Sequence, residues 1–513
     1  MNANGNHSQQ IVNKAKSYAH VLRDDGLSYL AYTEQITFLL FLKMLHELTQ
    51  PPHNKANPIP PDEDGNEYGW HKLLEADGDE LERLYRHTLE HLARQDGLLG
   101  EAFKKAKPEI QNPATLKRLI IDLIDSENWL SLDADVKGDI YEGMLEWMAA
   151  ESPKGAGQYF TPRELIKAIV DVMQPSPDDG VYDPACGTGG FLIRAFEQVS
   201  NEYRGQLDRD QKKHLKRGFV QGAELVPNTG RLGLMNLFLH GINSDHAADP
   251  PPIRSGEDAL ASDPGQRYSM VMTNPPFGKK SSFTVVTDSG EVEKEDHAYE
   301  RQDFWVTTKN KQLNFVQHVH TTLAQHGTCA IVVPDNVLFE GGAGETIRRN
   351  LLQQCDVHTL LRLPTGIFYA PGVKANVLFF DKKPAREQPW TSQLWVYDLR
   401  TNIHFTPKEN PLRREDLDEF VQCYNPANRH ERTPTWSEDN PNGQWRCFDY
   451  DELMKRDKVN LDLFWLRDES LEDSEALPEP DVLAREIADD LQTALEQFSS
   501  VADELARQDG QER

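Results

Sequence analysis

The sequence predicts an α/β fold in which a helical N-terminal part precedes a doubly wound, largely parallel sheet. Three observations lead to this prediction. Apolar residues recur at helical spacing before residue 150, short β-rich runs alternate with helices from about residue 155 to 383, and a glycine turn follows the first of those runs. Strands that alternate with helices are typical of a sheet covered on both faces, which binds ligands at the carboxyl ends of its strands.

We expect three regions along the chain. Residues 1–150 form a helical domain, with apolar helical periodicity at 36–48 and 116–124 and a proline-rich loop at 51–69. Residues 151–400 form the α/β domain. The strands expected there are 180–182, 218–223, 269–273, 329–333 and 377–381, and the expected helices are 191–199, 229–239, 313–325 and 345–354.

Two further segments carry predictions of their own. Residues 278–311 are polar and charged without apolar periodicity, and loops of that length are functional or disordered more often than they are filler. Residues 401–513 form a C-terminal region that becomes acidic and ends in a helix. Apolar residues from Ile487 to Leu505 follow 4-3 spacing, so this helix either folds back on its own domain or, as we favour, docks on a partner chain.

The composition is that of a soluble globular protein, with 38% hydrophobic and 27% charged residues. Its five cysteines are scattered and form no CxxC pair, so we expect no metal site, no disulfide framework and a cytoplasmic location. The N-terminus does not resemble a secretory signal. The most apolar stretch, residues 36–48, is much shorter than the roughly 20 residues of a membrane span.

The segment 183–191 reads Asp-Pro-Ala-Cys-Gly-Thr-Gly-Gly-Phe and joins an expected strand to an expected helix. Its glycines allow a tight turn and let backbone N–H groups approach a ligand closely. Neither GxGxxG nor GxxxxGK[ST] is present, which favours a cofactor without phosphates over a nucleotide triphosphate. The cofactor-binding residues expected in this turn are Asp183, Pro184, Gly187, Thr188, Gly189, Gly190 and Phe191.

A second motif, Asn274-Pro275-Pro276-Phe277, follows the strand expected at 269–273 and is predicted to be catalytic. The Asn274 side-chain oxygen and the Pro275 carbonyl can accept the two N–H bonds of an exocyclic amine, which favours tetrahedral geometry at its nitrogen. Phe277 can stack on the base, and positioning makes a strong general base unnecessary. A mere turn explains the motif poorly. Together, the two motifs predict methyl transfer from S-adenosylmethionine to the amino group of a planar base.

Two carboxylates are expected to complete the cofactor site. Glu224 ends the second strand, where it can accept both ribose hydroxyls. Asp258 lies where the third strand should end and could accept from the adenine amine. An acid at a strand end is often only a helix cap, but the glycine turn upstream favours the functional interpretation for both.

Gly157-Gln158-Tyr159-Phe160-Thr161-Pro162 precedes a helix expected to begin near Arg163. Thr161 is suited to be its N-cap, with Pro162 at N1 and Glu164 at N3. This run is either a simple helix start or the cover of the methionine end of the cofactor. The second interpretation makes cofactor-binding residues of Gln158, Tyr159, Phe160 and Thr161.

A base within a duplex cannot reach such a pocket, so the target must be flipped out. A second aromatic wall would help to hold it, and Phe368 is the candidate, with Tyr369 as the alternative. Phe368 could equally be ordinary core. The net charge of −28 is unsuited to a protein that grips DNA alone, since phosphate contacts need Lys and Arg. Residues 468–512 alone contain fifteen Asp or Glu against two Arg. Much of the grip on DNA should therefore come from another polypeptide.

The order of the two motifs resembles that of the γ-order N6-adenine DNA methyltransferases. Gly157–Pro162, Leu363–Phe368 and Gly372–Phe380 further resemble the modification subunit of type I restriction–modification systems, and this resemblance spans residues ~10–470. It implies a Rossmann-like S-adenosylmethionine-dependent methyltransferase domain with a C-terminal helical tail. It also implies two such subunits assembled with one DNA-specificity subunit, optionally with restriction subunits. The residues carried over are Thr161, Asp183, Gly187, Gly189 and Glu224 as cofactor contacts and Asn274, Pro275 and Phe277 as catalytic positions.

Three alternatives remain open from the sequence. A stand-alone adenine methyltransferase would need its own recognition domain, which the acidic C-terminus does not resemble. A protein glutamine-N5 methyltransferase would usually carry tyrosine in place of Phe277 and be much shorter. A non-catalytic scaffold is disfavoured because Asn274, Pro275 and Phe277 are intact.

Overall fold

The computed structural model describes residues 10–18, 27, 29–132, 143, 161–242, 250–277, 282–286, 292–296, 298–368, 374–400, 405–406 and 410–466. Residues 1–400 and 404–464 form one unit, and a second unit comprises residues 401–403 and 465–513. The heptad helix expected at 487–505 lies outside the described residues, as do Gln158, Tyr159, Phe160 and Tyr369.

The N-terminal part is helical, as predicted. Helix α2 buries the apolar stretch expected at 36–48, and the region expected to be a proline-rich loop contains no helix. Large aromatic side chains, among them Trp70, Tyr85 and Trp129, are fully buried and form the core of this part. The elements are α2 (Tyr29–Thr49), α3 (Trp70–Glu75), α4 (Gly78–Leu92), α5 (Gly97–Phe103), α6 (Pro113–Arg118), the π-helical turn η1 (Leu119–Ile124) and the 3₁₀ turn η2 (Trp129–Ser131).

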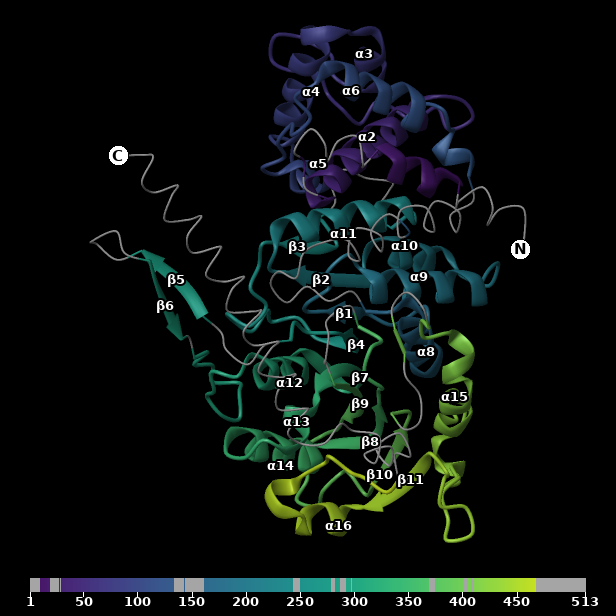
Figure 1. Cartoon of the computed structure of the whole chain (residues 1–513), viewed down its shortest axis with the longest axis vertical. Coiled ribbons are helices and arrows are strands. Elements are labelled where there is room, and N and C mark those ends of the chain that lie inside the picture. The colour runs from purple at the N-terminus through teal and green to yellow at the C-terminus, as the bar shows by residue number, and fades with distance from the viewer. Residues whose placement is uncertain are drawn as a thin grey trace, which may run out of the picture. The chain divides into compact units, whose positions relative to one another are not determined.

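Nine strands of the described residues form one sheet in the order β11-β10-β8-β9-β7-β4-β1-β2-β3 (Figure 1). Its central strands are apolar throughout, because helices cover both faces and leave neither to solvent. Only β9 and β11 run antiparallel to their neighbours. The strands are β1 (Val181–Asp183), β2 (Val220–Glu224), β3 (Ile253–Ser255), β4 (Tyr268–Thr273), β7 (Leu323–Pro334), β8 (Cys355–Arg362), β9 (Ala375–Lys382), β10 (Gln393–Asp398) and β11 (Trp445–Asp449).

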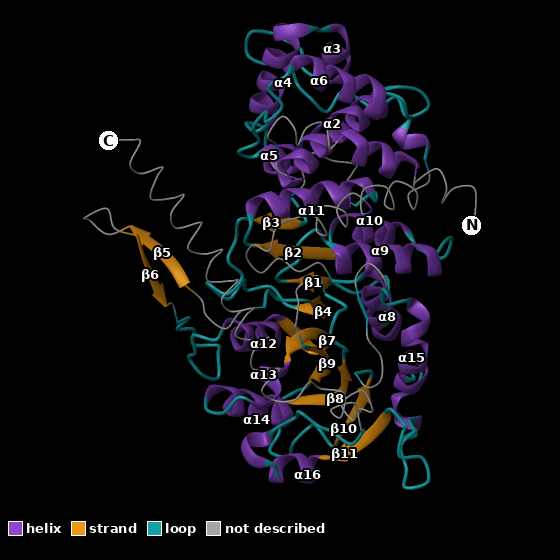
Figure 2. Ribbon diagram, in the orientation of Figure 1, coloured by secondary structure: helices purple, strands orange, loops and turns teal. Residues whose placement is uncertain are grey.

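Helices flank this sheet, with α12 and α14 on one side and α8 and α15 on the other in the view of Figure 2. This arrangement confirms the predicted α/β class. None of the helices among the described residues has the length and apolar character needed to cross a bilayer. The helices are α8 (Arg163–Met173), α9 (Gly190–Glu202), α10 (Arg209–Arg217), α11 (Pro227–Leu239), α12 (Lys311–Thr322), α13 (Asp335–Phe339), α14 (Ala343–Gln354), α15 (Asp418–Tyr424) and α16 (Tyr450–Lys455).

The structure corrects three details of the prediction. The helix expected at 313–325 ends at Thr322, because β7 begins at Leu323. Strand β8 was not predicted, since it follows α14 without an intervening turn residue. The polar segment 278–311 contains a two-stranded antiparallel pair, β5 (Ser282–Val286) and β6 (Val292–Asp296), which lacks the apolar alternation of a buried hairpin.

The chain reverses its direction of winding at β1. Strand β2 pairs with one edge of β1 and β4 with the other, both in parallel. Connections that leave β1 and β4 therefore diverge and open a crevice outside the carboxyl ends of these two strands. The two motifs singled out in the sequence begin at those ends.

Candidate active site

The turn after β1 is shaped by two glycines with left-handed backbone conformations, Gly187 (φ 55°) and Gly189 (φ 85°). A Cβ on Gly189 would lie 2.5 Å from the Leu237 Cδ1 atom, so the turn packs directly on α11. At Gly187, in contrast, a Cβ would meet no atom within 4 Å. The turn is thus closed toward the protein and open at Gly187, where a ligand can approach the backbone.

Helix α11 holds this turn from behind. The Asn236 side chain donates from Nδ2 to the Thr188 carbonyl at 3.0 Å, and a Cβ on Gly233 would lie 2.8 Å from the Gly187 carbonyl oxygen. Neither Asn236 nor Gly233 was predicted as a site residue. A glycine and an asparagine three positions apart in a buried apolar helix were the signal that could have identified them.

Glu224 is brought directly against the glycine turn. Its carboxylate accepts from the Gly187 N–H at 3.0 Å and from the Val226 N–H at 2.8 Å. Burial raises the pKa of this carboxyl above its ordinary value. The next residue, Leu225, is a large apolar side chain left 50% exposed beside it. A carboxylate and an exposed apolar side chain at the end of β2 suit a ribose and a planar ring, and the sequence prediction had missed Leu225.

Asp183 joins the two predicted loops. One of its carboxylate oxygens accepts from the Thr273 hydroxyl at 2.6 Å and from the Ala185 N–H at 3.0 Å, and the side chain is buried. Thr273 is the last residue of β4 and immediately precedes Asn274. Burial raises the pKa of Asp183 to about 7, and the negative charge of Glu224 adds to the rise.

The raised pKa of Asp183 makes the stability of the fold depend on pH. Between pH about 4 and about 7 the folded chain retains a proton that an unfolded Asp releases, so the free energy of unfolding falls as pH rises through this window. We expect the wild type to lose roughly 2 kcal/mol more than Asp183→Asn between pH 5 and pH 8. Urea unfolding of both chains at these two pH values measures the difference, and equal losses would contradict the pKa.

Asn274 lies against Thr161. Its Nδ2 donates to the Thr161 hydroxyl at 2.8 Å, whereas its Oδ1 is buried and has no hydrogen-bond partner among the described residues. A buried amide oxygen without a donor costs about 1–3 kcal/mol, so this atom is placed for a ligand donor. The N-cap role predicted for Thr161 is wrong, because α8 begins at Arg163 with Pro162 as its N-cap and no side-chain cap.

The two predicted aromatic walls, Phe277 and Phe368, contact each other. Their ring centroids lie 5.6 Å apart at an interplanar angle of 73°, and Phe368 is 2% exposed. A base stacked between parallel rings needs a separation of about 7 Å, twice the optimal distance between carbon atoms. The structure therefore brings these residues together edge to face, and a base can enter between them only if one ring moves.

Asp258 is already engaged by protein donors. One carboxylate oxygen accepts from the Tyr299 hydroxyl at 2.7 Å and the other from the Leu260 N–H at 3.0 Å. Tyr299 is buried and belongs to the polar segment 278–311, to which the sequence analysis assigned no residue roles. Part of that segment thus lies at the adenine end of the predicted cofactor site, where Asp258 would have to accept an amine in addition to the tyrosine.

Comparison with known proteins agrees with this geometry. Residues 132–461 match the family model for N-6 DNA Methylase, and residues 11–123 match that for the HsdM N-terminal domain. The methylase subunits of the type I restriction enzymes StySPI of Salmonella potsdam and EcoKI of Escherichia coli K12 are each 39% identical, over 98% of this chain and 96% of theirs. The crystal structure of the EcoKI M protein superposes with a TM-score of 0.53 at 36% identity, covering 97% of this chain and 96% of that one.

Proposed function

The chain belongs to the family of type I restriction enzyme methylase subunits and is an adenine-specific DNA methyltransferase, and from that premise we propose how its site works. S-adenosylmethionine donates the methyl group, the acceptor is N6 of an adenine flipped out of the duplex, and a separate specificity subunit selects the sequence. The observation that carries this proposal is the buried Oδ1 of Asn274, an acceptor without a donor.

The residues around the glycine turn fit a nucleoside cofactor. The open space at Gly187 admits a ligand against the backbone, and Glu224 lies beside it to accept from ribose hydroxyls. Leu225 offers its exposed side chain to the adenine ring. When bound there, S-adenosylmethionine supplies an electrophilic methyl group carried on a sulfonium.

Asn274 and Pro275 prepare the acceptor nitrogen. The free Oδ1 of Asn274 accepts one N–H of the adenine amine, and the Pro275 carbonyl accepts the other. These two bonds draw the nitrogen lone pair out of conjugation with the ring and orient it toward the methyl carbon. As the new nitrogen–carbon bond forms and the sulfur–carbon bond breaks, the nitrogen becomes cationic and then releases one proton to solvent. The hydrogen bond from Asn274 to Thr161 keeps the amide from rotating.

The aromatic pair closes the pocket until a base arrives. Because Phe277 and Phe368 contact each other edge to face, an extruded adenine displaces one ring and replaces its contact with stacking on the other. This exchange limits the cost of opening, since apolar contact is regained with the base.

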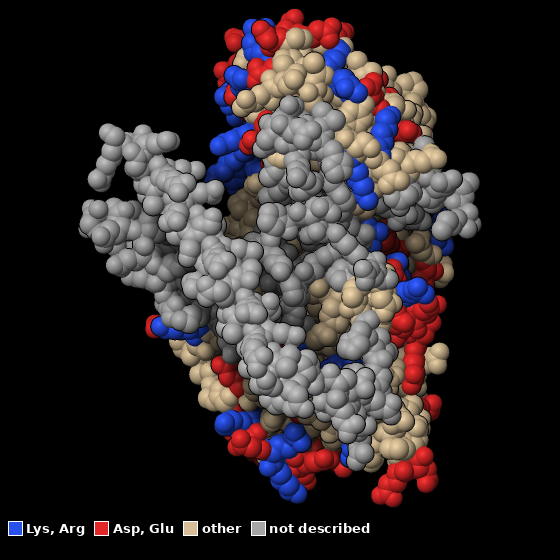
Figure 3. Space-filling view, in the orientation of Figure 1, with Lys and Arg blue, Asp and Glu red and all other residues tan. Residues whose placement is uncertain are grey.

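The charge of the chain supports a division of labour with a partner. The net charge is −28, and Figure 3 shows acidic and basic side chains interspersed over the described part of this face. Because affinity for DNA comes largely from phosphate contacts, the specificity subunit supplies much of the positive charge. We propose that two copies of this chain assemble with one specificity subunit, through the acidic C-terminal region.

The test is to express the chain with its specificity subunit and to sequence the host DNA for N6-methyladenine. We expect the mark at one bipartite sequence with the two chains together, and its absence with either chain alone. A mark placed by this chain alone would favour a stand-alone enzyme. No mark in any combination would overturn the proposal.

A further inference from the structure

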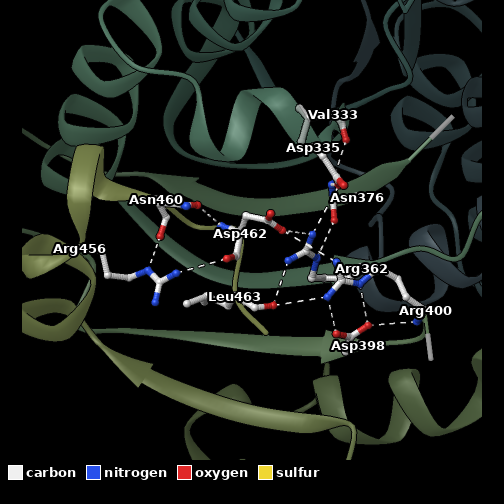
Figure 4. A network of polar contacts seen from close by, with 10 residues as sticks. All are labelled: Val333, Asp335, Arg362, Asn376, Asp398, Arg400, Arg456, Asn460, Asp462 and Leu463. Carbon is white, nitrogen blue, oxygen red and sulfur yellow. Dashed lines mark hydrogen bonds and ion pairs between the residues drawn. The ribbon is translucent and has the colours of Figure 1, made fainter. Parts of the chain in front are cut away.

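An extended segment, residues 456–463, is bound along the sheet by arginine side chains (Figure 4). Three guanidinium groups donate to its backbone carbonyls, and its apolar residues Val459, Leu461 and Leu463 alternate and are buried. The bonds run from Arg348 to Lys458 (2.7 Å) and Val459 (2.9 Å), from Arg362 to Leu463 (3.0 Å), and from Arg456 to Asn460 (2.6 Å) and Asp462 (3.2 Å).

Arg362 is the only one of the three that is fully buried, and it makes the most varied contacts. It forms an ion pair with Asp462, donates to the Asn376 amide oxygen at 3.1 Å and lies 3.5 Å from the Asp335 carboxylate. Nearby, Arg400 pairs with Asp398 at 2.6 Å. A buried ion pair of this kind is a poor source of stability compared with well-packed apolar side chains, so a positional role is the better explanation for its presence.

The position of Arg362 in the fold connects it with the base pocket. Arg362 ends β8, and residues 363–368 then lead directly to Phe368, which contacts Phe277. This connection has little slack. The Leu363 N–H donates to the Ala375 carbonyl at 3.1 Å, and a Cβ on Gly366 would lie 1.9 Å from the Phe405 carbonyl oxygen. A shift at the end of β8 is therefore passed on to Phe368.

We propose that Arg362 and Asp462 are positioning residues for methyl transfer, which place Phe368 against Phe277 by fixing the end of β8 to segment 456–463. This inference rests on the proposed function. Neither residue touches the base. Their contribution is to hold the aromatic wall within the narrow range of positions in which a flipped adenine stacks with its amine on Asn274.

Arg432 provides a matched control on the same strand. It is also buried, and it donates to the Thr359 hydroxyl at 3.0 Å and to the Tyr424 carbonyl at 2.6 Å, near the opposite end of β8. An Arg432→Lys chain loses guanidinium bonds to β8 without disturbing the end that leads to Phe368.

The experiment compares Asp462→Asn, Arg362→Lys and Arg432→Lys with wild type, each assembled with the specificity subunit and shown by circular dichroism to be folded at the assay temperature. Transfer of labelled methyl groups gives kcat and the KM for S-adenosylmethionine. A duplex with 2-aminopurine at the target position reports base flipping by its fluorescence. We expect the first two changes to lower kcat on the order of 10-fold or more and to reduce the 2-aminopurine signal, with the KM for the cofactor unchanged.

The Arg432→Lys chain should retain the wild-type kcat and fluorescence. An unchanged kcat in folded Asp462→Asn would overturn the inference, and so would an equal fall in Arg432→Lys, because that would indicate a general loss of structure. An inactive wild-type complex would overturn the proposed function itself, and the inference with it.

Discussion

Replacing Asn274 with alanine is expected to lower kcat for methyl transfer by about 100- to 1,000-fold while the affinity for S-adenosylmethionine stays near that of wild type. The change removes the buried Oδ1, the acceptor that holds the adenine amine. It leaves the glycine turn and its bonds to Glu224 intact, because those contacts do not involve Asn274. Single-turnover methyl transfer measures the rate, and calorimetric titration with the cofactor measures its affinity.

Thr161→Val is the matched control for Asn274→Ala. Both changes remove the 2.8 Å hydrogen bond between these side chains, but valine leaves the Asn274 oxygen in place. We expect only a small part of the rate loss in Thr161→Val, since the amide is less firmly oriented but still present. If both variants lost activity equally, orientation by Thr161 rather than the free oxygen would be the essential feature. Full activity in Asn274→Ala would show that the catalytic assignment is wrong.

Gly187→Ala is expected to weaken cofactor binding by roughly 10- to 100-fold, which corresponds to the cost of forcing a methyl group into an occupied site. In the structure the added Cβ meets no protein atom within 4 Å, so the obstruction is directed at the ligand and not at the fold. The left-handed backbone at this position adds about 1–2 kcal/mol of destabilisation.

Gly205→Ala separates these two effects. Gly205 has φ 80° and equally open surroundings, but it lies in the turn between α9 and α10, away from the carboxyl ends of β1 and β4. Both variants should therefore lose similar stability on heating, and only Gly187→Ala should lose affinity in calorimetric titration. Equal affinities in the two variants would mean that the cofactor does not approach Gly187.

Much of the fold could be predicted because its signals are local. The helix at α2, the strands β1, β2, β4 and β9, and the loop from Pro51 to Gly69 each depend on periodicity or on proline within a short window. Strands β8, β10 and β11 were not predicted. Whether an apolar run becomes a strand there depends on the neighbour that pairs with it, and β8 pairs with β9 and β10.

The sequence by itself determined the fold class, the family resemblance and the identity of the residues at the two motifs, because backbone freedom at Gly187 and the donor and acceptor groups of Asn274 belong to the residues themselves. Only the tertiary structure decided what those groups contact. It gave the Thr161 hydroxyl to Asn274 instead of a helix cap, closed Phe277 against Phe368, and engaged Asp258 with Tyr299. These partners lie between 41 and 113 residues apart in the chain. Contacts between such distant residues are set by the strand order of the sheet, and a local pattern of residues carries no record of it.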